Sequence, residues 1–262
     1  MKNKSIGNLI IGLVLVFLFL PIVVLVVYSF NNSSTNIVFD GFTLKWYKEL
    51  FSNTNLMDAF FNTILVASVS TIISTVIGTI SAVGLYKYDF YGKRLINALL
   101  YIPIVIPEIV LGISLLSVYT LMKLELGLFT LLIAHVTFSI PYVIVSVRSS
   151  LSRDTSLQEE ASYDLGVGKF KTFWYITLPN IMPGIISGAT LAFTLSLDDV
   201  IVSYFTVGPG SNTLPQYIYS MIKTGITPDV NALSSLVLLV VIIVLTFLVI
   251  YDARKIKLEA RK

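Results

Sequence analysis

The sequence predicts an all-α, polytopic integral membrane protein with about six transmembrane helices. Of its 262 residues 13% are charged and 55% are hydrophobic, and the mean hydropathy is +0.85. A soluble domain carries about 25% charged residues, because its surface has to stay hydrated. Five long stretches hold no Asp, Glu, Lys or Arg: residues 5–39, 59–86, 126–147, 172–197 and 230–251. Since one span needs roughly 20 apolar residues, each stretch is long enough to cross a bilayer.

These uncharged stretches place the helices along the chain. A further apolar stretch, residues 95–122, carries one acid, Glu108, near its middle. We expect spanning helices at about residues 7–29, 60–85, 96–122, 126–147, 182–205 and 231–251, within a single domain over residues 1–262. The first apolar run is longer than the roughly 7–15 residues of a signal-peptide core, so we expect an uncleaved helix.

Lys and Arg are distributed unequally between alternate loops. The side with both termini holds 14 of the 18, and the other side holds four: Lys45, Lys48, Lys123 and Lys223. Positive residues are enriched in cytoplasmic loops. We therefore expect a multi-pass protein of the cytoplasmic membrane with both termini in the cytoplasm.

Two loops show local structure of their own. On the outer side, residues 44–51 have helical spacing and two aromatic residues, Trp46 and Tyr47, which predicts a short helix on the membrane surface. On the cytoplasmic side, residues 149–181 predict two short amphipathic helices. Ser156 is the expected N-cap of the first, with Glu159 three residues later.

The ends of these two cytoplasmic helices follow from glycine and proline. We expect Gly166 and Gly168 to end the first helix, and Pro179 to stop a second helix over residues 169–177. The pattern alone leaves open whether this segment is a docking surface for a soluble partner or an ordinary loop.

One motif in this loop is specific. Bacterial ATP-binding-cassette importer permeases share the pattern E-A-A, three residues, G, nine residues, I, one residue, L-P. The matching positions here are Glu160, Ala161, Ser162, Gly166, Ile176, Leu178 and Pro179. Six of the seven agree, and Ser162 replaces the second alanine with another small residue. The chain therefore resembles the type I importer permeases of this family.

The resemblance implies a MetI-like permease fold and a set of partners. In the family, this coupling helix sits in a groove of the nucleotide-binding subunit and transmits its closure to the membrane helices. The implied partners are a second, homologous permease subunit, two ATPase subunits, an extracytoplasmic solute-binding protein and the lipid bilayer, with no nucleic acid. ATP and Mg²⁺ belong to the ATPase, because this chain has no G-x-x-x-x-G-K-[ST] motif. We expect no catalytic residue, metal or cofactor here.

Further stretches resemble the spermidine/putrescine permeases within that family. They include Ser196-Leu197-Asp198-Asp199-Val200 and the segments 41–47, 217–223 and 230–233. The implied solute is a polyamine. Permeases for other small solutes, such as iron or an anion, share much of this framework and stay an alternative.

Acids in apolar helices support a cationic solute independently. An acid in the hydrocarbon costs about 3 kcal/mol or more, so it usually faces a polar cavity. We expect Asp198 and Glu108 to lie on the solute path, with Asp199 and Tyr219 as further candidates. Asp199 has an alternative role at the outer interface or as the cap of a broken helix, and Glu108 in packing. The single histidine, His135, is expected to be an interhelical hydrogen-bond partner rather than a ligand.

Two questions remain open from the sequence alone: the role of three tyrosines, and whether the chain belongs to another class of membrane protein. Tyr204, Tyr217 and Tyr219 fit interface aromatics better than cation-binding walls. A proton- or sodium-coupled secondary transporter would also hold acids in the membrane, but it usually has more helices or an inverted repeat. A structural membrane subunit would not need the spacing from Glu160 to Pro179. Co-purification of an ATPase chain separates these classes.

Overall fold

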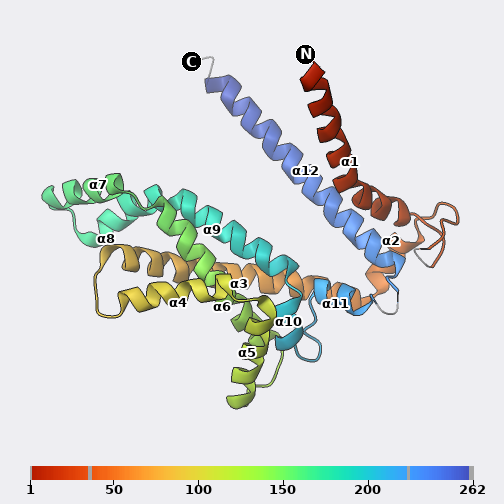
Figure 1. Ribbon diagram of the computed structural model, residues 1–262, viewed down its shortest axis with the longest axis horizontal. Coiled ribbons are helices and arrows are strands. Elements are labelled where there is room, and N and C mark those ends of the chain that lie inside the picture. Colours follow the sequence, from red (N-terminus) through yellow and green to blue (C-terminus); the bar gives the residue numbers. More distant parts are fainter. Residues whose placement is uncertain (1, 35–36, 223–224, 260–262) are drawn as a thin grey trace. The chain divides into compact units, whose positions relative to one another are not determined.

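The computed structural model describes residues 2–34, 37–222 and 225–259, and most of them are helical (Figure 1). Two compact units are formed, one by Met1–Met57 with Ser220–Lys262 and the other by Asp58–Tyr219. In the described part of the chain, extended pairing is limited to an isolated bridge between Asn31 and Phe42. The predicted all-α class is confirmed, whereas the single domain over residues 1–262 stays a prediction.

The first unit is built on two long helices, α1 (Lys2–Tyr28) and α12 (Pro228–Glu259), which pack together (Figure 1). Large apolar side chains along α1 are exposed, with Leu9 at 64% and Phe17 at 78%. Water would penalise such a surface, whereas lipid accepts it. The helix therefore has the surface of a membrane span.

A short helix, α2 (Lys45–Glu49), and a 3-10 turn, Leu50–Ser52, follow α1 in the same unit. The predicted helix over residues 44–51 is thus present. However, Trp46 is buried, and its Nε1 donates a hydrogen bond of 2.6 Å to the carbonyl oxygen of Asn31. The expectation that Trp46 faces the membrane interface is wrong, because the indole N–H finds its partner inside the protein.

The second unit contains most of α3 and all the helices up to α11. Their bounds are α3 Thr54–Lys87, α4 Lys93–Val105, α5 Glu108–Leu121, α6 Leu128–Ser150, α7 Arg153–Asp164, α8 Lys169–Thr172, α9 Leu178–Asp198, α10 Ile201–Thr206 and α11 Leu214–Ser220. Helices α6 and α9 pack along their lengths. A Cβ added to Gly188 of α9 would lie 3.0 Å from Cα of Val143 in α6. Small residues allow this close approach, as is common between membrane helices.

The core of this unit lies between α3, α6 and α9. Its buried members are Ala82, Leu85, Val143, Ile144, Val147, Leu151, Ile181 and Ala192. Gly78 of α3 belongs to the same contact, since a Cβ there would lie 2.6 Å from Cγ1 of Val143. Three helices are thereby packed against one another.

The lengths of the apolar helices agree with a polytopic membrane protein. Four described helical stretches are long and apolar enough to cross a bilayer: Gly7–Tyr28, Thr54–Lys87, Leu128–Ser150 and Lys169–Asp198. The bent pair α4 and α5 counts as a fifth candidate span. The sixth expected span lies in α12, whose apolar part among the described residues is Pro228–Val244.

The expectation of one helix over residues 96–122 is wrong. Helix α4 ends at Val105, α5 begins at Glu108, and the two axes differ by 112°. Pro107 has no N–H to continue the helix, and its ring pushes Ile106 into the extended region at φ −70° and ψ 137°. Glu108 is consequently the first residue of α5 rather than the middle of a continuous helix.

The expectation of a helix over residues 182–205 also needs correction. Helix α9 begins at Leu178 and ends at Asp198, Asp199 is extended with ψ 126°, and the chain resumes as α10 at Ile201. The carboxylate of Asp199 accepts hydrogen bonds from the next backbone N–H groups, which stabilises a new helix start in place of a continuous helix. The alternative that Asp199 caps a broken helix is confirmed.

Candidate functional site

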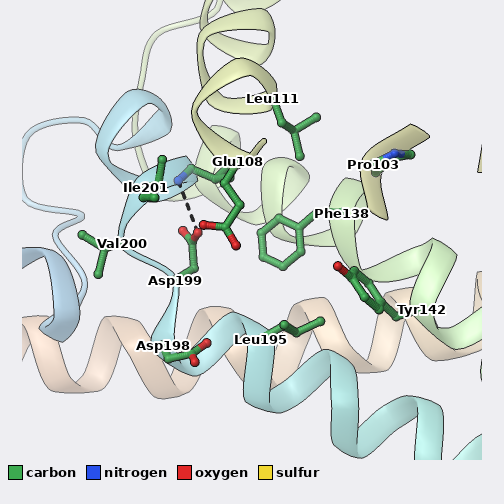
Figure 2. Close-up of a pocket in the computed structure, with 11 residues that line it drawn as sticks. Pro103, Glu108, Leu111, Phe138, Tyr142, Leu195, Asp198, Asp199, Val200 and Ile201 are labelled. Carbon is green, nitrogen blue, oxygen red and sulfur yellow. Dashed lines mark hydrogen bonds between the residues drawn. The ribbon is translucent and has the colours of Figure 1, made fainter. Parts of the chain in front are cut away.

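The two helix breaks of the second unit border one cavity of about 280 Å³ (Figure 2). Its walls carry three carboxyl groups: Glu108 at the start of α5, Asp198 at the end of α9, and Asp199 in the link to α10. The rest of the lining is apolar or aromatic and comprises Pro103, Leu111, Phe138, Tyr142, Leu195, Val200, Ile201 and Val202. Thus the structure brings together three of the four predicted path residues.

The two adjacent aspartates have different surroundings. Asp199 is buried and accepts hydrogen bonds from the N–H of Val202 (3.2 Å), the N–H of Ser203 (2.7 Å) and the hydroxyl of Ser203 (2.6 Å). Asp198 is exposed. In Figure 2 the carboxyl groups of Glu108 and Asp199 lie at the centre of the view, and Asp198 projects from the end of α9. Asp199 is therefore held rigidly, whereas Asp198 is accessible to a solute.

The chemistry of this lining favours an organic cation. Ionised carboxylates accept charge-assisted hydrogen bonds from ammonium groups. Phe138 and Tyr142 supply aromatic rings, whose faces attract cations. Among the described residues that line the cavity, three are acidic and none is basic. A positively charged solute with apolar segments complements such a surface.

Of the tyrosines considered in the sequence, Tyr219 is the one expected on the solute path. Tyr219 in α11 and Tyr204 in α10 are 55% and 60% exposed, and neither belongs to the lining described above. The rings at the cavity belong instead to Phe138 and Tyr142 of α6, which sequence reasoning missed. Their spacing of four residues places them on one helix face, and this was the only signal that could have linked them.

Behind the cavity, His135 of α6 is completely buried. Its Nδ1 lies 2.6 Å from Oγ of Ser196 in α9, and its Nε2 lies 3.0 Å from Oγ of Ser203 in α10. The prediction that His135 is an interhelical hydrogen-bond partner is confirmed.

The coupling segment predicted from the motif forms a helical hairpin from α7 to the start of α9. Its N-cap is Ser152, whose Oγ accepts a hydrogen bond of 3.3 Å from the N–H of Thr155. The expectation that Ser156 is the N-cap is wrong, because the helix begins one turn earlier and Ser156 lies inside it. The helix ends at Asp164, and Gly166 follows it with φ +79°, as expected for the glycine that ends the helix. The expectation that Gly168 also ends this helix is wrong, because Gly168 is extended and is the N-cap of α8.

The end of α7 is a Schellman motif. The N–H of Gly166 donates to the carbonyl oxygen of Tyr163 (2.9 Å), and the N–H of Val167 donates to that of Ser162 (3.0 Å). A left-handed backbone at Gly166 is required for this pair of bonds. The glycine of the motif is thus explained by local geometry.

The second arm of the hairpin differs from the expected short helix. After α8, residues Phe173–Thr177 form a π-helical segment that continues directly into α9. Pro179 does not stop the helix, because it lies in the first turn of α9, where a missing N–H is tolerated. Ile176 lies in the π-helical segment, and Leu178 is the first residue of α9.

Buried polar contacts join the hairpin to the membrane helices. The carboxylate of Glu159 in α7 lies 2.8 Å from Nζ of Lys87 at the end of α3, and it accepts a hydrogen bond from the hydroxyl of Thr177. Ser162 is buried and its Oγ lies 2.9 Å from that of Thr172. The small side chain of Ser162 therefore packs inside the hairpin, whereas Glu160 and Ala161 are exposed. Sequence reasoning did not single out Glu159 for this link.

Known proteins of the same kind match nearly the whole chain. Residues 74–256 match the family model described as "Binding-protein-dependent transport system inner membrane component". The spermidine/putrescine transport system permease protein PotC of Escherichia coli (strain K12) is 42% identical over 241 residues, which is 91% of each chain. The putrescine transport system permease protein PotI of the same strain is 39% identical over 229 residues, 85% of this chain and 82% of that protein.

Solved structures agree on the fold. A chain of a bacterial ABC transporter involved in the import of the acidic polysaccharide alginate superposes with a TM-score of 0.73 at 12% identity, covering 94% of this chain and 95% of that one. The predicted MetI-like permease fold and the resemblance to PotC are confirmed. The chain belongs to the family of binding-protein-dependent transport system inner membrane components.

Proposed function

We propose that this chain is the permease subunit of an ATP-driven importer that carries polyamines, putrescine or spermidine, across the cytoplasmic membrane. The observation that carries the proposal is the cavity where Glu108, Asp198 and Asp199 meet the rings of Phe138 and Tyr142. Polyamines alternate ammonium groups with methylene segments. Carboxylates neutralise the former, and apolar and aromatic walls accept the latter.

The relatives support the same solute. PotC and PotI are described as spermidine/putrescine and putrescine permeases. Within the proposed path, Asp198 receives the cation from outside and Glu108 receives it at the start of α5. Asp199 adds a third charge that the protein itself holds in place. The exposed ring of Tyr219 in α11 contacts the solute before it reaches the cavity, as part of the same proposed path.

ATP hydrolysis takes place on partner subunits in this proposal. The hairpin of α7, α8 and the π-helical segment carries the motif and docks on an ATPase subunit through its exposed positions, among them Glu160 and Ala161. Ser162 packs inside the hairpin and supports its shape. Movement there reaches α3 through the ion pair of Glu159 with Lys87, and reaches α9 through Thr177. This chain supplies coupling and half of the solute path, and no hydrolysis.

The partners follow from the same assignment. They are a second permease subunit, two ATPase subunits that bind ATP and Mg²⁺, and a polyamine-binding protein outside, which correspond to PotB, PotA and PotD. The cytoplasmic position of both termini is part of this proposal and rests on the distribution of Lys and Arg.

A transport assay on the reconstituted complex tests the function. Proteoliposomes with the permease pair and the ATPase are given labelled putrescine, spermidine, iron or an inorganic anion, each with its binding protein, and either ATP or a non-hydrolysable analogue. We expect uptake of putrescine or spermidine that requires hydrolysable ATP. ATP-dependent uptake of iron or of the anion alone would assign the chain to the alternative solute class. Polyamine uptake driven by a proton or sodium gradient without ATP would indicate a secondary transporter.

A further inference from the structure

A row of buried polar side chains runs behind the cavity and ends at Asp199. Oγ of Ser70 in α3 lies 3.2 Å from Oγ of Ser196 in α9. Oγ of Ser196 lies 2.6 Å from Nδ1 of His135, and Nε2 of His135 lies 3.0 Å from Oγ of Ser203. The hydroxyl of Ser203 in turn donates to Oδ2 of Asp199 over 2.6 Å. All five side chains are buried.

The last bond fixes the direction of the others. Ser203 has one hydroxyl proton and donates it to a carboxylate, which only accepts when ionised. Its oxygen therefore accepts the proton on Nε2 of His135. A completely buried imidazole is favoured as the neutral form, because a second charge would have to leave water. Neutral imidazole with a proton on Nε2 has an acceptor at Nδ1, so Ser196 donates to it.

This arrangement spans the break between α9 and α10. Ser196 lies in the last turn of α9, and Ser203 lies within α10. The backbone between them leaves the helix at Asp199 and Val200, so the bonds that would hold a continuous helix are missing there. His135 contacts both sides of the break from α6. One side chain thus holds together the two ends that set where Asp198 and Asp199 lie in the cavity.

We propose that His135 is a positioning residue for the cation site: as the Nε2–H tautomer it orients Ser203, which holds the carboxylate of Asp199 at the cavity wall. The inference rests on the proposed function. His135 is not part of the lining, so it acts through Ser203 rather than on the solute. The lining residues explain which groups meet the cation. His135 explains why the hydroxyl of Ser203 points at Asp199 and adds to the two backbone N–H groups that fix this third carboxylate.

Three substitutions of His135 distinguish a role in positioning Ser203 from a role in packing alone. In His135→Gln the terminal amide nitrogen reaches the place of Nε2 and can still donate to Ser203. In His135→Asn the shorter amide ends near the place of Nδ1 and cannot reach Ser203, and His135→Leu removes both contacts. Uptake of putrescine and spermidine is measured per assembled complex in proteoliposomes, with KM and Vmax determined separately.

We expect His135→Gln to keep KM near the wild-type value. His135→Asn and His135→Leu should raise KM about tenfold, because Ser203 is then no longer oriented and its hydrogen bond to the charged carboxylate of Asp199 is weakened. The unaltered chain is measured alongside, and its failure to transport either polyamine would count against the proposed function alone. Equal KM in all three variants, with only the amount of complex reduced, would show that His135 is merely structural. Full affinity in His135→Asn but not in His135→Gln would overturn the proposal, because the contact with Ser196 and not the contact with Ser203 would then carry the effect.

A spectroscopic measurement tests the tautomer without any solute. The chain has one histidine, so ¹⁵N-histidine labelling of the full-length chain in lipid, purified on a tag without histidine, gives a single imidazole signal pair. We expect a protonated Nε2 and an unprotonated Nδ1. A proton on Nδ1, or on both nitrogens, would overturn the proposal.

A matched pair of serine variants connects that signal to the cavity. Ser203→Ala removes the acceptor of Nε2 and is expected to shift its resonance. Ser114→Ala is the control, because the hydroxyl of Ser114 donates to the carbonyl oxygen of Val110 in its own helix. An unchanged Nε2 resonance in Ser203→Ala would contradict the contact on which the positioning role depends.

Discussion

Asp198 and Asp199 are neighbours in the sequence, but they have different structural environments and different roles. The carboxylate of Asp199 accepts bonds from Val202 and Ser203, so removal of its charge weakens the start of α10. Asp198 ends α9 and is exposed. Substitutions that remove only the charge should therefore affect transport at Asp198 and assembly at Asp199.

At Asp198 the informative change is Asp198→Asn, which keeps the shape and removes the charge. We expect polyamine uptake per assembled complex to fall about tenfold or more, because a charge-assisted contact to an ammonium group is lost. The amount of complex should stay constant. Asp40→Asn is the control, because Asp40 is an exposed acid outside the cavity lining. Full uptake by Asp198→Asn with normal assembly would place the cation site on another residue.

The residues of the site were predictable only in part. An acid in an apolar stretch stands out in the sequence, because placing it in the hydrocarbon of the membrane costs free energy. Glu108, Asp198 and Asp199 are predictable for this reason. Phe138, Tyr142 and Ser203 are ordinary residues of apolar helices. Phe138 and Tyr142 become part of the site only because α6 lines the cavity, and Ser203 only because α10 begins beside Asp199. Both contacts are properties of the three-dimensional packing.

At the scale of the elements, the two helix breaks determine where the acidic residues of the cavity lie. Hydropathy does not detect these breaks. An apolar stretch has the same mean hydropathy whether it is straight or bent. The break at Pro107 carried a local signal, because a proline restricts the preceding residue. The break at Asp199 carries a weaker signal: an aspartate is a possible cap, but it caps a new helix only when the following N–H groups are free to turn toward it. Consequently hydropathy predicts continuous helices over residues 96–122 and 182–205, where the structure has breaks.

Gly166 offers a test of the coupling element. We expect Gly166→Val to reduce substrate-stimulated ATP hydrolysis of the assembled complex about tenfold, because a β-branched residue at φ +79° costs about 1–2 kcal/mol and opens the Schellman turn. Among the described residues nothing lies within 4 Å of a Cβ added there, so strain rather than collision is the cause.

Gly166→Asn is the matched control for that strain. Asparagine adopts the left-handed region more readily than other residues, so stimulated hydrolysis should stay close to that of the unaltered chain. Loss of coupling in both variants would mean that the partner's groove excludes any side chain at this position. Normal coupling in Gly166→Val would remove the reason to regard α7 as the docking helix.

At the scale of the whole molecule, the number of membrane spans and the orientation of the chain in the membrane depend on different properties of the sequence. The number follows from apolar length, and the described helices include four single spans and a bent fifth. The orientation follows from charge, with 14 of 18 Lys and Arg on one side. The family match over residues 74–256 extends across both compact units, so both belong to the permease framework.

Orientation can be tested directly, because the chain has no cysteine of its own. Ser34→Cys and Arg153→Cys introduce single thiols at exposed positions, one in the predicted outer loop and one at the start of α7. In right-side-out membrane vesicles, a membrane-impermeant maleimide should label Ser34→Cys at once and Arg153→Cys only after the membrane is opened. The cysteine-free chain gives the background. The reason is the charge asymmetry, which keeps the loops rich in Lys and Arg in the cytoplasm. The opposite order of labelling would invert the topology, place α7 outside and remove the docking surface from the reach of any ATPase.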